Sequence, residues 1–202
     1  MRRNEPNPNP SPPSLARMAP AGLWTVFWCG WLLATLLWDV LGADLQVMHG
    51  LGNAQGFAMR DHWFLSEVMH TGARQLALLL YLGVLLMVWW PVGVFRSLSR
   101  PQRLQAWWGV TLAVLAVNLM KRSSLTSCPW DLQDFGGAAI YVSHWHWGVL
   151  DGGGGNCFPG GHVSSALAFL GLALPWLGSG LTAQRRLGRR ILLGVLLAGL
   201  VL

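Results

Sequence analysis

The sequence predicts an all-α fold, a polytopic transmembrane helical bundle of five apolar segments with the last one incomplete. Hydrophobic residues make up 53% of the 202 residues and charged residues only 11%, too little charge to cover a soluble globule. Several apolar runs approach the ~20 residues that a helix needs to cross a bilayer core about 30 Å thick. The runs lie at residues 23–41, 75–95, 107–120, 163–181 and 191–202. Tryptophans near their ends suit the membrane interface.

The arginines fall in alternate connecting segments, which predicts the orientation of the bundle. Because positive residues favour the cytoplasmic side, we expect the N-terminus in the cytoplasm and residues 42–74 and 122–162 outside. The net charge of +6 is therefore explained by topology, and we expect membrane lipids and no nucleic acid as partners. The arginines concerned are Arg2, Arg3, Arg17, Arg96, Arg100, Arg103, Arg185, Arg186, Arg189 and Arg190.

Residues 1–22 are expected to form a disordered cytoplasmic tail, and residues 23–202 a single membrane-embedded domain. The tail is rich in proline and poor in side chains that could be buried. The first apolar run is longer than the ~7–15 residues of a signal peptide core. No clear cleavage site follows it, so we expect an uncleaved span.

The first outer loop, residues 42–74, alternates apolar and charged side chains and predicts an amphipathic helix at the membrane interface. Two interpretations remain: a helix that only packs over the bundle, or a rim through which lipid enters. The spacing of His49, His62 and His70 is not typical of a metal site, so we interpret them as surface or interface histidines.

The last apolar run, residues 191–202, would form a helix of only ~18 Å at ~1.5 Å per residue. This is shorter than the bilayer core. A terminal carboxylate inside the membrane is costly, so we expect the chain to be the front part of a longer protein or to have an abnormal end.

The candidate site combines the single lysine of the chain, Lys121, with the segment Cys157-Phe158-Pro159-Gly160-Gly161-His162. The lysine ends one apolar run and the segment precedes the next, so both are expected at the same membrane face. An ammonium, two glycines that permit close backbone approach and an imidazole together favour an anion such as a phosphorylated lipid. The alternatives are a lysine that snorkels to the interface and a Gly-Gly-His turn that only caps a helix.

These motifs resemble the type 2 phosphatidic acid phosphatase superfamily, in particular its bacterial inner-membrane members. The first family motif is Lys, six residues, Arg-Pro, and the chain has Lys121, six residues, Cys128-Pro129. The second is Pro-Ser-Gly-His, and the chain has Pro159-Gly160-Gly161-His162. The resemblance implies a membrane lipid phosphatase, or its N-terminal part, that hydrolyses a lipid phosphate or diphosphate.

The resemblance also implies roles for individual residues. Lys121, Gly160 and Gly161 would bind the substrate phosphate, with Arg122 as one possible replacement for the family arginine. His162 would be the acid that protonates the leaving lipid oxygen. The third family motif, which carries the nucleophilic histidine, is not found, so we expect the 202-residue chain to be inactive alone. The scheme needs no cofactor and no metal.

Cys128 and Cys157 both lie in the second outer loop, where an oxidising compartment would permit a disulfide between the two motifs. A structural bridge is the preferred interpretation. One alternative function is a membrane thiol oxidoreductase that uses this pair, although the chain has no Cys-x-x-Cys motif. Another is a membrane protein without catalytic activity, which the absent nucleophile favours.

Overall fold

A computed structural model describes residues 21–202, and they are helical without any strand. The all-α prediction is therefore confirmed for this part of the chain. The predicted tail lies outside the described residues up to residue 20. The chain divides into two compact units, residues 1–44 and 45–202, which we describe separately.

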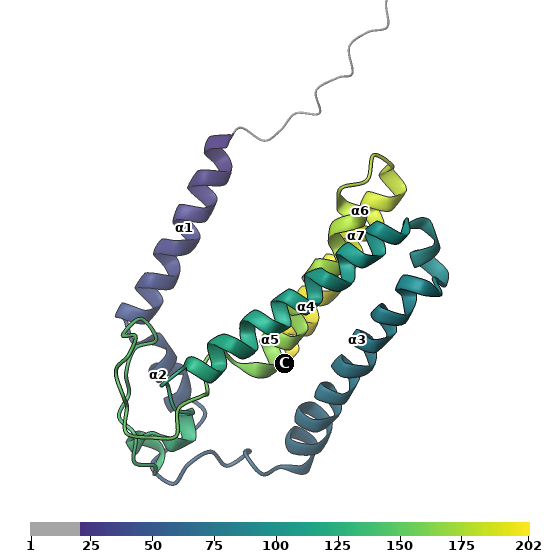
Figure 1. The fold of residues 1–202 in the computed structure, drawn as a ribbon. Helices are drawn as coiled ribbons and strands as arrows, with labels where there is room; N and C mark the ends of the chain where they lie inside the picture. Colours follow the sequence, from purple (N-terminus) through teal and green to yellow (C-terminus); the bar gives the residue numbers. More distant parts are fainter. Residues whose placement is uncertain (1–20) are drawn as a thin grey trace, which may run out of the picture. The chain divides into compact units, whose positions relative to one another are not determined.

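The described part of the first unit is a single helix followed by a short turn. Helix α1 (Ala21–Val40) covers the first predicted apolar run (Figure 1). The indole N–H of Trp38 donates to Oδ1 of Asp44 over 2.8 Å and ties the turn to the last helical turn.

The second unit contains four long helical segments, and each predicted apolar run after the first lies largely within one of them. After α2 (Ala43–His49), which straddles the two units, the π-helix η1 (Phe64–Gly72) runs directly into α3 (Ala73–Trp89). The 3₁₀ turn η2 (Gly93–Ser97) leads to α4 (Arg100–Ser123). Residues 124–160 follow, within the second loop that is predicted to lie outside, and we call them the outer loop. They contain the 3₁₀ turns η3 (Pro129–Asp131) and η4 (Gln133–Phe135). The chain then forms α5 (Gly161–Leu167), η5 (Ala168–Ala173), α6 (Leu174–Leu177) and α7 (Thr182–Val201).

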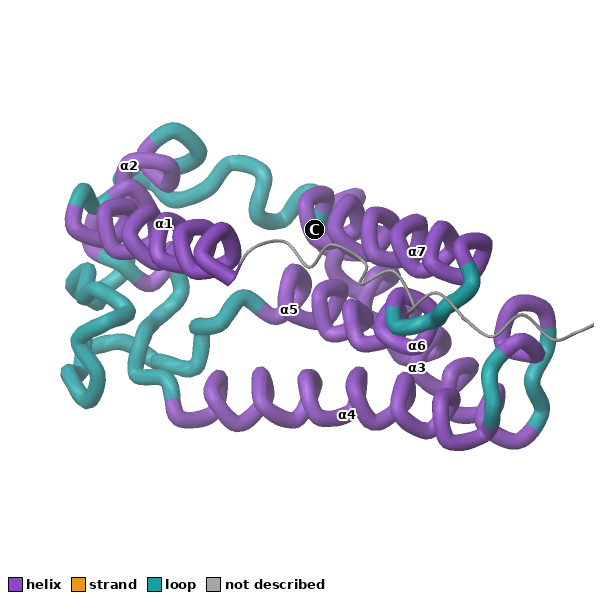
Figure 2. Tube along the Cα trace, turned by 90° about the horizontal axis from the view of Figure 1, so that it is seen from above, coloured by secondary structure: helices purple, strands orange, loops and turns teal. Residues whose placement is uncertain are grey.

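The segment α5–η5–α6 lies between α4 and α7, and α3 packs against α4 (Figure 2). Val110 of α4 is fully buried against Ala168 and Phe169 of η5. The crossing is close because both helices carry a glycine there: a Cβ added to Gly171 would lie 3.0 Å from the carbonyl carbon of Gly109. Small residues let two helix backbones approach in this way.

The basic connections and the outer loop lie at opposite ends of this bundle. At the basic end, the indole N–H of Trp176 donates to the Ser97 hydroxyl over 3.2 Å, and its ring meets Phe95 edge to face at 5.3 Å. Arg96 and Arg100 lie beside this contact in the sequence, and α7 starts close to it. The other ends of α3, α4 and α5 face the outer loop (Figure 1).

One described helical run, Phe64–Ser97, is long and apolar enough to cross a membrane, and a bent combination of α1 and α2 would be a second. The number of helices that are long and apolar enough to cross a membrane is lower than the five predicted segments, because polar residues begin or end the other helices. Arg100 and Arg103 open α4, four arginines lie in α7, and Gly161–Leu177 is short.

The prediction for the last segment was wrong about where its helix begins. Helix α7 starts at Thr182, not at residue 191, and has 20 residues. Arg185, Arg186, Arg189 and Arg190 lie on the helix and not in a loop. Arginine and glutamine are good helix formers, so the helix extends beyond the apolar run.

The predicted amphipathic helix in residues 42–74 also needs correction. After the short helix α2, residues 50–62 form turns, and the second helical part, η1, continues directly into α3. It is therefore an extension of a bundle helix and not a separate interfacial helix. Its π-helical geometry is notable because π-helices are frequent at functional sites.

Candidate functional site

Lys121 and the Gly-Gly-His turn meet at the outer end of the bundle. The Lys121 ammonium lies 3.4 Å from the carbonyl oxygen of Cys157 and donates to it. A Cβ placed on Gly161 would lie 4.0 Å from the lysine Nζ. The lysine side chain is half-buried in this position and is directed toward the start of α5 and not into solvent.

Backbone pairing within the outer loop holds the turn beside α4. The N–H groups of Asn156 and Cys157 donate to the carbonyls of Ser124 and Thr126 over 2.8 and 3.0 Å. With its amide nitrogen facing α4, the Asn156 side chain donates to the carbonyls of Lys121 and Arg122. These carbonyls belong to the last turn of the helix, where the Lys121 carbonyl also accepts from the Ser124 N–H over 3.3 Å, so Asn156 caps α4 at the candidate site.

A disulfide joins Cys128 to Cys157, with Cα atoms 5.0 Å apart. It links the position at which the resembled family has an arginine to the residue whose carbonyl contacts Lys121. The cysteine therefore supplies a covalent tie in place of a positive charge. Cys29, the remaining cysteine, is free and exposed, so the described residues contain no second dithiol for a redox cycle.

A buried carboxylate, Asp151, organises the centre of the same loop and is only 4% exposed. It accepts hydrogen bonds from the backbone N–H and hydroxyl of Ser127 over 2.6 and 2.8 Å, and from the Gly153 N–H over 2.9 Å. Burial alone would raise the pKa of Asp151, but these hydrogen bonds outweigh it and lower the pKa below 3.8. Because Ser127 precedes Cys128, the carboxylate supports the disulfide and, through it, the site.

His162 is the second residue of α5 and lies against His70 of the π-helix. The two imidazole centroids are 4.2 Å apart, and Nε2 of His162 lies 3.3 Å from the His70 carbonyl oxygen. When Nε2 carries a proton, it donates to this carbonyl, which leaves Nδ1 as the nitrogen free for a ligand. His70 is exposed, as predicted for a surface or interface histidine, and it also contacts the candidate acid.

The structure does not bring Arg122 to this group. Its side chain is exposed, because neighbouring residues on a helix point in different directions. The Asp131 carboxylate in the outer loop accepts a hydrogen bond from the Cys128 N–H over 3.3 Å. Gly160 is exposed, and a Cβ at this position would meet open space.

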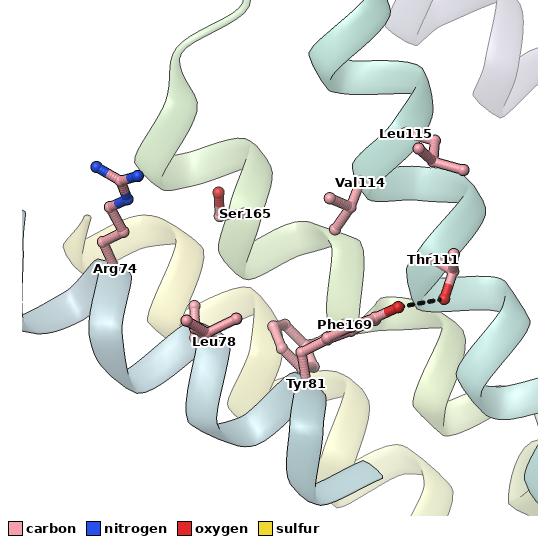
Figure 3. A pocket seen from close by; sticks show the side chains of 9 residues that line it. Arg74, Leu78, Tyr81, Thr111, Val114, Leu115, Ser165 and Phe169 are labelled. Atoms are coloured by element: carbon pink, nitrogen blue, oxygen red, sulfur yellow. Dashed lines mark hydrogen bonds between the residues drawn. The ribbon is translucent and has the colours of Figure 1, made fainter. Parts of the chain in front are cut away.

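A cavity of about 310 Å³ lies between α3, α4 and the segment α5–η5, and Ser165 in its lining belongs to the same helix as Gly161 and His162. Arg74 and Ser165 occupy one end of it, and Tyr81 and Thr111 meet at the other (Figure 3). The Ser165 hydroxyl donates to the Gly161 carbonyl over 2.6 Å and so connects the cavity to the turn. The remaining lining residues are apolar: Ala77, Leu78, Val114, Leu115 and Phe169.

Sequence reasoning missed His70, Arg74 and Asp151. His70 and Arg74 are four residues apart at the junction of η1 and α3, so both point to nearly the same side. That spacing was the available signal for the pair. Nothing local marks Asp151 as buried, because its partner Ser127 is 24 residues away.

The assembled group can bind an anion and exchange a proton with it. It offers an ammonium, a guanidinium, backbone N–H groups and an imidazole above an apolar cavity. The described residues contain no group of three side chains able to hold a metal ion. Comparisons with protein-family models, with curated proteins and with solved structures found no match for this chain.

Proposed function

We propose that the chain is a multi-pass membrane protein of the lipid phosphatase type, or the N-terminal part of one. Its candidate site would bind the phosphate or diphosphate head group of a lipid at the outer, periplasmic face of a bacterial inner membrane. The proposal rests on the two motifs and on the geometry of Lys121 and the turn Gly160-Gly161-His162.

The surface of the helices supports a membrane location. Many large apolar side chains on α3, α4 and α7 are half or more exposed, whereas soluble monomers rarely expose large contiguous apolar patches. Close packing at Gly109 and Gly171 is typical of membrane helices. The arginines of the connection between α3 and α4 and of the first half of α7 lie at the end of the bundle away from Lys121, as the positive-inside tendency expects for an outer site.

Lys121 supplies the positive charge that a phosphate dianion needs. Its only hydrogen-bond partner among the described residues is the Cys157 carbonyl at 3.4 Å, a long contact that a phosphate oxygen can replace. A charge-assisted hydrogen bond to phosphate contributes about 1.5–3 kcal/mol. The N–H groups of Gly160 and Gly161 can approach the same oxygens because no side chain covers them.

His162 is suited to protonate the leaving group. With Nε2–H held by the His70 carbonyl, a protonated ring carries its transferable proton on Nδ1. In hydrolysis the P–O bond to the lipid breaks, phosphorus bonds to the attacking nucleophile, and this proton passes to the lipid alkoxide oxygen. General acid catalysis of this kind contributes about a hundred- to ten-thousand-fold.

The nucleophile is the part of the scheme for which this sequence offers no residue at the family spacing. No histidine follows His162. We therefore expect the 202-residue chain to bind the head group without releasing phosphate, and a phosphohistidine to form only when a third motif is supplied.

The proximity of Lys121 to the Gly-Gly-His turn carries the proposal, and phosphonate binding tests it. The purified chain in phosphatidylcholine nanodiscs is titrated with a short alkyl phosphonate, a head group that cannot be hydrolysed. We expect Lys121→Ala to weaken binding about 10- to 100-fold, the loss of one charge-assisted hydrogen bond.

Arg122→Ala is the matched control, because it removes one positive charge next to Lys121 but outside the site. We expect it to change affinity by less than about threefold, as for a screened surface charge. Equal losses in the two variants would mean that general charge attraction explains binding, and the proposed site would be wrong.

A further inference from the structure

The cavity below the candidate site has the shape and polarity expected for a ligand with an anionic head and one apolar tail. Its volume of about 310 Å³ is at the lower end of the ~300–1,000 Å³ that ligand pockets occupy. Five of its nine lining residues are apolar, and the polar ones lie at its two ends. An apolar wall with a cationic mouth favours an amphiphile over an inorganic anion.

The end of the cavity that Arg74 and Ser165 line, which we call its mouth, is connected to the head-group site by two contacts. Ser165 lines the cavity and donates to Gly161 over 2.6 Å. Arg74 lies one helical turn after His70, and His70 contacts His162. No carboxylate of the described residues forms an ion pair with Arg74, so its guanidinium is available to an anion.

The end of the cavity opposite Arg74, which we call its floor, is formed by a hydrogen-bonded pair of side chains, one on α3 and one on α4. The hydroxyls of Tyr81 and Thr111 are 3.1 Å apart. The Thr111 hydroxyl donates to the Trp107 carbonyl over 2.9 Å, so Tyr81 is the donor to Thr111. Both groups are therefore satisfied, and they close the cavity without attracting a second polar group (Figure 3).

We infer that this cavity is a slot for the single hydrocarbon tail of a phosphorylated amphiphile, that Arg74 is a second cation for its head group, and that the Tyr81–Thr111 pair limits tail length. The inference rests on the proposed function and deepens it. Arg74 would supply the charge that Cys128 cannot supply.

The dimensions indicate how much tail the slot holds. Seven residues separate Arg74 from Tyr81, which is a depth of about 10 Å at ~1.5 Å per residue. A methylene is similar in size to a water molecule, which takes about 30 Å³, so the cavity holds on the order of ten methylenes. Each buried methylene should improve affinity about fourfold.

A chain-length series of n-alkyl phosphonates tests the inference on the full chain in phosphatidylcholine nanodiscs, with methylphosphonate and inorganic phosphate as tail-free ligands. We expect the dissociation constant to fall about fourfold per methylene and to level off near ten carbons. Partition into bulk lipid alone would give a dependence that continues past this length, and that result would overturn the slot.

Two variants change the slot in opposite directions. Tyr81→Ala opens the floor and should move the plateau to longer tails, whereas Ala77→Leu narrows the wall and should move it to shorter ones. Leu79→Ala, on an exposed part of the same helix, is the control and should leave the plateau unchanged. If one of these two variants fails to fold, the other still tests whether the cavity limits tail length. A plateau that stays at the same tail length in the folded variants would contradict the inference.

Arg74→Gln should weaken every phosphonate, including methylphosphonate, by about tenfold or more, without moving the plateau. An unchanged affinity would remove Arg74 from the site. The series also separates the two proposals. If methylphosphonate binds through Lys121 but tail length has no plateau, only the slot is wrong; if no phosphonate binds at all, the proposed function is wrong as well.

Discussion

Ser127 and Asp151 form the buried centre of the outer loop: the backbone N–H and the hydroxyl of the serine donate to the two carboxylate oxygens over 2.6 and 2.8 Å. The Gly155 N–H adds a third connection, a 3.0 Å hydrogen bond to the same serine hydroxyl. Ser127 precedes the Cys128 half of the disulfide, and Cys157 contacts Lys121. The geometry of the candidate site therefore depends on this carboxylate, although Asp151 is not part of the site.

The loop should lose stability in acid because the pKa of Asp151 is lowered below 3.8 in the folded protein, despite its burial. A lowered pKa contributes stability that is fully present above the unfolded value, 3.8, and is lost as pH falls through the folded value. Hydrogen exchange of the segment 124–157, corrected for intrinsic rates, should therefore speed up below pH 3.8.

Asp151→Asn should lower the free energy of opening of the same segment at neutral pH by about 1.5–3 kcal/mol, because charge-assisted hydrogen bonds are lost. It should also abolish the acid transition, that is, the faster exchange at low pH. Asp134→Asn changes an exposed carboxylate of the loop, 41% accessible, and should keep the transition. An acid transition that survives in Asp151→Asn would contradict the role of this carboxylate.

The disulfide should stabilise the outer loop and the affinity of the site together. Its cysteines are 29 residues apart, and closing a loop of this length is worth about 3–4 kcal/mol in the chain-entropy treatment. We expect the double variant Cys128→Ser/Cys157→Ser to lower the melting temperature and to weaken phosphonate binding, because the Gly-Gly-His turn is no longer covalently held beside the end of α4.

Cys29→Ser is the control for loss of a cysteine and should change neither quantity. The same proteins test the redox alternative through thiol labelling after mild reductant. A structural bridge resists such treatment, whereas rapid release of both thiols at neutral pH would favour the oxidoreductase interpretation.

The crossing of α4 and η5 should be intolerant of any side chain at Gly171. A Cβ there would lie 3.0 Å from backbone atoms of Gly109, which cannot move independently of the helix. Gly171→Ala should therefore destabilise the bundle by about 1–3 kcal/mol, as overpacking does. Thermal unfolding in detergent measures the effect.

Gly83→Ala provides the matched comparison, since a Cβ at this helical position meets nothing within 4 Å. This substitution should be neutral or stabilising by about 0.5–1 kcal/mol, because alanine favours the helix. Equal behaviour of the two variants would show that α4 and η5 do not cross at these glycines.

The helices could be predicted from the sequence, but their ends could not. Long apolar runs mark the part of a helix that is buried in protein or lipid, and each predicted run lies largely within a helical segment. The arginines of α7 escaped this reasoning because a charged residue can continue a helix as well as an apolar one. The direct passage of η1 into α3 escaped it because the interrupted apolar pattern of residues 59–70 favoured a separate element.

The candidate site was predictable where chemistry follows local sequence, and not where it depends on tertiary contact. Lys121, Gly161 and His162 could be identified because each lies at the end of an apolar run. The partnership of His70 with His162 joins residues 92 positions apart, which no local pattern indicates. The structure places Arg122 on a different face of α4 from Lys121, because adjacent residues of a helix point in different directions.

His70 and His162 should differ in their effect on ligand binding. His162→Ala removes the ring itself and should weaken phosphonate binding about tenfold, the loss of one hydrogen bond to a charged group. His70→Ala keeps the backbone carbonyl that accepts from Nε2 in the native protein, so we expect a change below about threefold. A larger loss for His70→Ala, measured by the same titration, would assign ligand contact to the His70 ring.

A double-mutant cycle on phosphonate binding tests the central claim, that Lys121 and His162 contact one and the same anion. Affinities are measured for the native chain, Lys121→Ala, His162→Ala and the double variant. Two groups on one ligand should be coupled by about 0.5–3 kcal/mol, so the double variant should lose less than the two single losses combined. Strict additivity, or a loss confined to one of the two single variants, would contradict the account.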